Sequence, residues 1–232
     1  MTDVPAGPAK PNIAAVADEF LQEQGSRLSA KRLSKYRQVI DLFCIYLDGY
    51  WPGESQEAYG RITKMGGTFC TWFGPDRIPG GYSEFLGYYM GHKVMGGMET
   101  KRAAGTVMKL FAEWLAGKGY IRRAEEAVER SKRASKQLPA AEGACRILEA
   151  CARKPPRDQV SGEIEDHFSV VRVEPGKIWL TPLSRGLGTV LGPIPVPARA
   201  SSILKADWDV SGVVGKTSHG WRLIEVWNVS AF

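Results

Sequence analysis

The chain has 232 residues and a formal net charge of +6, with the ordinary globular composition of 44% hydrophobic and 24% charged residues. No apolar run approaches the ~18 residues of a membrane-spanning helix, and the N-terminus lacks the basic-then-apolar pattern of a secretory signal. We therefore expect a cytoplasmic protein without a membrane partner. The four cysteines form no CxxC pair, so we expect neither a disulfide framework nor a metal site, and no cofactor.

The first half of the chain shows helical periodicity. Residues 1–12 are rich in Pro, Ala and Gly and predict a flexible lead-in. A helix is predicted over Ile13–Gln24, and a longer one within Leu28–Leu47, where Ser29 has the place of an N-cap. The apolar residues of the longer helix recur at three- and four-residue steps, which places on one side Leu33, Tyr36, Ile40, Phe43 and Leu47.

Basic residues crowd the first two turns of that longer helix, namely Lys31, Arg32, Lys35 and Arg37. Positive charge there opposes the helix dipole, which favours acids at an N-terminus. An anionic partner would explain the arrangement. A solvated polar face on a core helix explains it equally well from this stretch alone.

Further helices follow along the chain. Ser55 is expected to cap a short helix that runs through Ile62, and the Gly and Pro residues of 74–81 predict a loop. Ser83 is expected to cap the next helix, and Thr100 to open a last strong one. The apolar side of that last helix comprises Ala103, Val107, Leu110, Phe111 and Trp114, with Lys101, Arg102 and Lys109 away from it.

Two stretches, Phe20–Leu47 and Glu84–Ile121, resemble the SAM-like core-binding domain of the tyrosine recombinase (phage integrase) family. The shared pattern is a short helix, Leu-Ser, a Tyr-containing helix, and a late Thr-started helix with Trp-Leu and a Gly-Tyr-Ile tail. The resemblance implies a helical module at residues 13–121 that grips duplex DNA. Carried over position by position, it implies DNA contacts at Lys31, Arg32, Lys35, Thr100, Lys101, Arg102 and Lys109. The large catalytic domain of that family has no counterpart of its size here.

Residues 122–158 are predicted to form a charged connector. Its first helix, Arg122–Lys136, has little apolar face, and Leu138-Pro139 separates it from a second helix over Ala141–Ala152. From residue 159 onward, short β-branched runs alternate with turn residues and predict about five strands. The fold class is therefore α+β: a helical bundle of the integrase core-binding type, followed at residues 159–232 by a small SH3-like or OB-like barrel.

Motifs that carry chemistry are weak. His219 and Arg222 mimic the His-x-x-Arg pair of tyrosine recombinases, but they span a predicted turn and strand, and the last tyrosine is Tyr120, so no nucleophile follows them. No catalytic residues are predicted. Four tryptophans of the β region could form a binding platform, or simply fill a small barrel: Trp179, Trp208, Trp221 and Trp227.

The sequence thus favours a non-enzymatic protein that binds double-stranded DNA, with the β domain contacting a protein partner or the DNA. The alternative is a protein–protein adaptor whose basic residues only aid solubility. A hydrolase with an unrecognised site is a third, weaker hypothesis. A contiguous basic face shared by the two helices would favour DNA, and an exposed aromatic groove would favour a protein ligand.

Overall fold

A computed structural model describes residues 7–94, 97–154, 159–184 and 188–231. The chain divides into two compact units, residues 1–90 with 99–136 (the helical unit) and residues 91–98 with 137–232 (the β unit). The boundary falls within the long helix α8 and not at the end of the expected connector, because the two halves of that helix pack into different cores.

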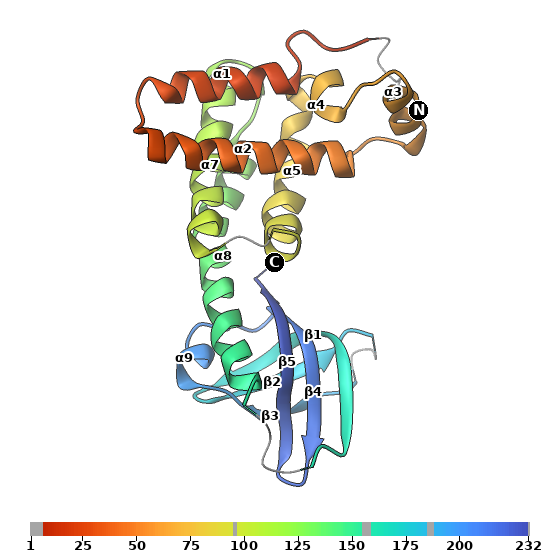
Figure 1. Cartoon of the computed structure of the whole chain (residues 1–232), viewed down its shortest axis with the longest axis vertical. Coiled ribbons are helices and arrows are strands. Elements are labelled where there is room, and N and C mark those ends of the chain that lie inside the picture. The colour runs from red at the N-terminus through yellow and green to blue at the C-terminus, as the bar shows by residue number, and fades with distance from the viewer. Residues whose placement is uncertain (1–6, 95–96, 155–158, 185–187, 232) are drawn as a thin grey trace. The chain divides into compact units, whose positions relative to one another are not determined.

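The helices confirm an α-helical N-terminal region (Figure 1). In chain order they are α1 (Ile13–Gly25), α2 (Ala30–Tyr50), α3 (Gln56–Lys64), α4 (Phe69–Trp72), η1 (Pro75–Arg77), α5 (Ile78–Glu84), η2 (Phe85–Tyr89), α6 (Met90–His92), α7 (Met98–Gly117) and α8 (Glu125–Ala152). The described part of the expected flexible lead-in is held in place, since the Ala9 amide donates to the Trp72 carbonyl at 2.8 Å.

Helices α1 and α2 lie side by side and α7 crosses them (Figure 1). Phe20 of α1 is fully buried and contacts the Tyr36 ring of α2 and the Phe111 ring of α7, at centroid distances of 6.3 and 5.0 Å. Ser29 does precede α2, but its hydroxyl makes no capping hydrogen bond, unlike that of Ser55, which accepts from the Ala58 amide at 3.1 Å. The contacts of the Phe20 ring therefore hold α1, α2 and α7 together.

The loop predicted over residues 74–81 is wrong, because η1 and α5 cover most of that range. Pro79 lies in the first turn of α5, where its missing N–H is not needed. Gly81 is buried so tightly that an added Cβ would lie 2.8 Å from a Leu47 methyl group. Ser83, expected to cap a helix, lies inside α5. Close packing against α2 overrides the usual meaning of these glycines.

Pro139 does not interrupt the connector, because α8 is one continuous helix of 28 residues that includes Pro139. Nor is the first half of α8 without a buried face, because Ala127, Ser131 and Ala134 are buried. Gly105 of α7 approaches this half so closely that an added Cβ would lie 2.4 Å from the Ser135 amide nitrogen. Small residues, which carry little hydrophobic signal in sequence, make this helix–helix contact possible.

The β unit contains a five-stranded antiparallel sheet in the order β3-β2-β1-β4-β5, curled into a half-barrel. Its strands are β1 (Gly162–Glu174), β2 (Lys177–Pro182), β3 (Leu191–Pro195), β4 (Asp209–Thr217) and β5 (Gly220–Ser230), with the short helix α9 (Ala198–Ser201) after β3. Hairpin turns join β1 to β2 and β4 to β5, and the proline-rich β3 is an edge strand. The second half of α8 packs Ala141, Ala144 and Leu148 into the core of the sheet.

Candidate functional site

A groove of about 430 Å³ lies between α2 and α7 in the helical unit. It is lined by Arg32, Lys35, Tyr36, Glu99, Arg102, Ala103, Thr106 and Val107. Its charged residues come from the first two turns of both helices, and the Lys35 ammonium group contacts the Glu99 carboxylate at 2.7 Å. The groove therefore combines a cationic rim with the beginnings of two helices.

Glu99 faces more positive charge than it can neutralise. The pKa of its carboxyl group is lowered, first by the hydrogen bond from Lys35 and further by the nearby charges of Lys31 and Arg102. Its side chain is 78% exposed, and that of Lys35 is 38% exposed. Three cations surround one carboxylate, so the site keeps a positive excess that is open to solvent.

The floor of the groove is apolar. Val107 is 1% exposed, and Ala103 and the Tyr36 ring are half-buried. Burial raises the pKa of the Tyr36 hydroxyl, so the ring remains neutral throughout the physiological range. A neutral floor beneath a cationic rim suits a ligand that presents anionic groups at its edge.

The structure brings together only some of the predicted contact residues. Arg32, Lys35 and Arg102 line the groove, and Lys31 lies close enough to influence Glu99. Lys101 was expected to lie away from the buried side of its helix, but it is only 5% exposed. It lies one turn before Gly105, on the face of α7 that packs against α8.

Two further predicted residues lie outside the groove lining. Thr100 is half-buried and does not open α7, which begins at Met98. Lys109 pairs with Glu113 one turn further along the helix, at 3.4 Å. Conversely, Glu99 and Thr106 line the groove and were not predicted. Their three- and four-residue spacing from Arg102 and Ala103 was the available signal, but apart from Thr100 only basic residues were considered.

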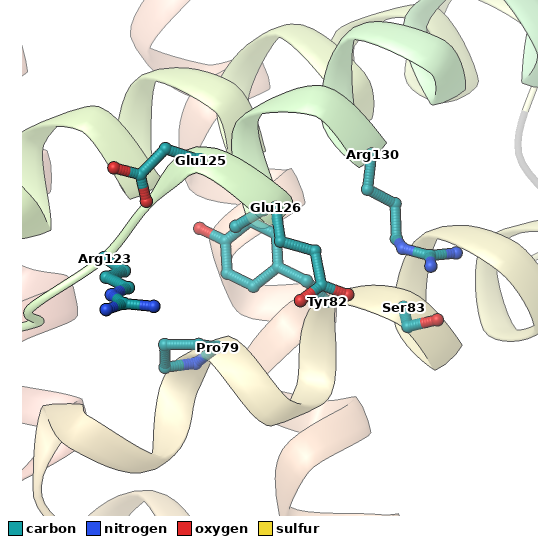
Figure 2. Close-up of a pocket in the computed structure, with 8 residues that line it drawn as sticks. Pro79, Tyr82, Ser83, Arg123, Glu125, Glu126 and Arg130 are labelled. Atoms are coloured by element: carbon teal, nitrogen blue, oxygen red, sulfur yellow. The ribbon is translucent and has the colours of Figure 1, made fainter.

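A second hollow, of about 390 Å³, lies between α5 and the start of α8 (Figure 2). Its charged lining is balanced, with Arg123 and Arg130 against Glu125 and Glu126. Tyr82 forms part of its wall, but the hydroxyl of this residue already donates to the Met108 carbonyl at 3.1 Å. This cavity therefore lacks the net positive charge of the groove.

In the β unit, a histidine and a serine face each other across β1 and β4. Nδ1 of His167 lies 2.6 Å from the Ser211 hydroxyl. Burial raises the pKa of Asp209, and the nearby charges of His92 and His167 partly oppose that increase. Ser211 is 4% exposed, so its hydroxyl is poorly accessible to a substrate. The pair gives little support to a hydrolase.

The four tryptophans of the β unit have different surroundings. Trp208 is 4% exposed and belongs to the core, as expected for a residue that fills a small barrel. Trp227 is 51% exposed, beside a hollow of about 310 Å³ between the end of α8 and β5. Barrel filling therefore accounts for Trp208 but not for Trp227.

Within the described ranges, no cluster of three or more His, Cys, Asp or Glu side chains is arranged to hold a metal ion. No helix among the same residues has the length and apolar character needed to cross a bilayer. No family model, curated protein or solved structure matches the chain. The functional argument therefore depends on the groove itself.

Proposed function

We propose that the protein is a non-enzymatic DNA-binding protein whose groove between α2 and α7 contacts the phosphate backbone of a duplex. The observation that carries this proposal is the shared cationic rim: Arg32 and Lys35 from α2 face Arg102 from α7, with Lys31 beside them. The sequence criterion was a contiguous basic face that the two helices share. Lys31, Arg32 and Arg102 lie near one another, whereas Lys101, which also belonged to that criterion, is buried. Phosphate contacts by Lys and Arg supply most of the sequence-independent affinity for DNA.

The helix beginnings add to this electrostatic argument. Helix α2 begins at Ala30 and α7 begins at Met98, and the Lys35–Glu99 ion pair joins their first turns. The unpaired N–H groups and the positive dipole end of each helix favour an anion nearby. Lys31 and Arg32 lie in the first turn of α2, where their charge opposes the helix dipole, and a bound phosphate would offset that charge together with the charges of Lys35 and Arg102.

The resemblance to the core-binding domain of tyrosine recombinases points to the same two helices. In that family, the helices that correspond to residues 29–47 and 100–115 face the nucleic acid, and in this chain α2 and α7 form the groove. We accordingly propose a SAM-like module of the integrase core-binding type for the helical unit. For the curled five-stranded sheet we propose an SH3-like or OB-like barrel that binds a partner or assists DNA binding.

Fluorescence anisotropy with a labelled random-sequence duplex tests the proposal. Each lost phosphate contact costs roughly five- to tenfold in affinity near ~0.1 M salt, so Lys35→Ala combined with Arg102→Ala should weaken binding by about twentyfold or more. Arg123→Ala combined with Arg130→Ala is the matched control, because it removes equal charge from the balanced cavity. Equal losses in the two double variants would contradict a role for the groove.

One observation favours the adaptor alternative. Trp227 is 51% exposed beside a hollow lined by Arg153, Ile224 and Val226. Exposed tryptophan next to a groove is typical of protein-binding surfaces. If Trp227→Ala abolishes capture of a protein partner while the groove variants leave DNA affinity unchanged, the adaptor function replaces DNA binding.

A further inference from the structure

The Glu99 carboxylate lies where an anionic ligand would neutralise the positive charge of the groove. Its carboxylate accepts a hydrogen bond from Lys35 at 2.7 Å and lies within the field of Lys31 and Arg102. The side chain is 78% exposed, so no packing holds it in that position. An exposed ion pair of this kind contributes only about 0.2–1 kcal/mol. The carboxylate can therefore be displaced at small cost.

We propose that Glu99 is an internal competitor for phosphate: it holds Lys35 in the free protein and is displaced when a backbone phosphate binds in the groove. This inference rests on the proposed DNA-binding function and adds a residue that limits affinity. The role of Glu99 is opposite to that of a contact residue, because its removal strengthens binding.

Displacement leaves a specific thermodynamic signature. A Glu99 carboxylate separated from Lys35 lies beside a phosphate and attracts a cation from solution, which offsets part of the counterion release that drives DNA binding. Glu99→Gln keeps the size of the side chain and one acceptor oxygen but carries no charge, so it needs no such cation. The variant should therefore bind DNA with a steeper dependence on salt than the natural protein.

The matched control is Glu129→Gln. Glu129 is also an exposed glutamate of the helical unit, and its ion pair with Lys132 lowers its pKa as Lys35 lowers that of Glu99. It lies on α8 and is not part of the groove lining. The two variants change the net charge equally, so a difference between them isolates the effect of the groove.

The experiment measures affinity for a random-sequence duplex by anisotropy over a salt series, using the natural chain and both glutamine variants. We expect Glu99→Gln to bind about two- to fivefold more tightly at low salt, with a log–log salt slope steeper by up to ~0.9. Glu129→Gln should match the natural chain in slope. Thermal melts of all three proteins would confirm that they remain folded.

The outcomes separate this inference from the proposed function. If the natural chain binds DNA through Lys35 and Arg102 but Glu99→Gln behaves like Glu129→Gln, the competitor role is wrong and DNA binding stands. Weaker binding by Glu99→Gln would also overturn the inference, because Glu99 would then support the site. If no protein in the series binds DNA, both proposals are wrong.

Discussion

The two ends of α7 carry opposite imbalances of charge. Just beyond its C-terminal end, Lys118 contacts both Glu19 and Glu23 of α1. Aromatic groups complete that cluster: the Tyr120 hydroxyl donates to Glu19 at 2.6 Å and the Trp114 indole N–H donates to Glu23 at 2.8 Å. At the N-terminal end, the single carboxylate of Glu99 faces three cations.

This difference distinguishes a charge cluster that is satisfied within the protein from the groove for which we propose DNA binding. A lysine near a helix C-terminus complements the dipole, and here it has two carboxylate partners. Lys31, Lys35 and Arg102, in the first two turns of α2 and α7, share the single carboxylate of Glu99. The first arrangement is satisfied within the protein, whereas the second keeps the positive excess that the proposed DNA phosphate would offset.

The largest expected effect is the loss of stability when Phe20 is truncated, because its ring contacts both the groove floor and the C-terminal cluster. Phe20 contacts Tyr36 in the groove floor and Trp114 in the C-terminal cluster, at centroid distances of 6.3 and 5.4 Å. Phe20→Ala should lower the free energy of unfolding by about 3–5 kcal/mol, measured by urea denaturation. Ile45→Ala, at a position 58% exposed on α2, should change it by less than about 0.5 kcal/mol. Similar losses in both variants would mean that Phe20 does not join the helices.

A smaller loss is expected where α7 meets α8. Gly105→Ala places a methyl group 2.4 Å from the Ser135 amide nitrogen and should destabilise the protein by about 1–3 kcal/mol. Helix propensity alone predicts the opposite sign, a gain of about 1 kcal/mol. Gly117→Ala, with open space around the position on the same helix, is the control. A gain in stability for both variants would disprove the close helix contact.

The C-terminal cluster should produce a modest dependence of stability on acid pH. Hydrogen bonds from Tyr120 and Lys118 lower the pKa of Glu19, and hydrogen bonds from Lys118 and Trp114 lower that of Glu23, both below the ordinary value of 4.5. Because the folded-state pKa values are depressed, this stabilisation is complete above pH 4.5 and is lost as the pH falls through the folded values.

Lys118→Met should flatten that dependence in urea denaturation between pH 6 and pH 3 without altering DNA affinity at neutral pH. An unchanged pH profile would show that the cluster does not contribute to stability. A loss of DNA affinity would show that the two ends of α7 are not functionally separate.

Sequence periodicity predicted the fold where burial follows a simple pattern. The apolar residues that recur at helical spacing in α1 are all buried, and the β-branched runs form strands that pair as β1 with β2 and β4 with β5. The failures involve small residues and proline. Gly81 and Gly105 allow close packing, and α8 continues through Pro139, all of which depend on tertiary neighbours.

The site was predictable in outline only. The surplus of bases at the start of α2 indicated Arg32 and Lys35, and both line the groove. The buried face of α7 was assigned only in part, because Lys101 lies on the face that packs against the first half of α8, a helix expected to have little apolar face. Glu99 was missed because two of the three cations that lower its pKa, Lys31 and Lys35, are distant in sequence.

The salt dependence of duplex binding tests the central claim most directly. If the groove cations each neutralise one phosphate, the plot of log affinity against log salt concentration should have a negative slope with a magnitude of at least about 2 for the natural chain. Arg102→Ala should reduce that magnitude by about 0.9. Arg130→Ala, in the balanced cavity, should leave the slope unchanged. Absence of binding at low salt, or equal slopes for Arg102→Ala and the natural chain, would contradict the account.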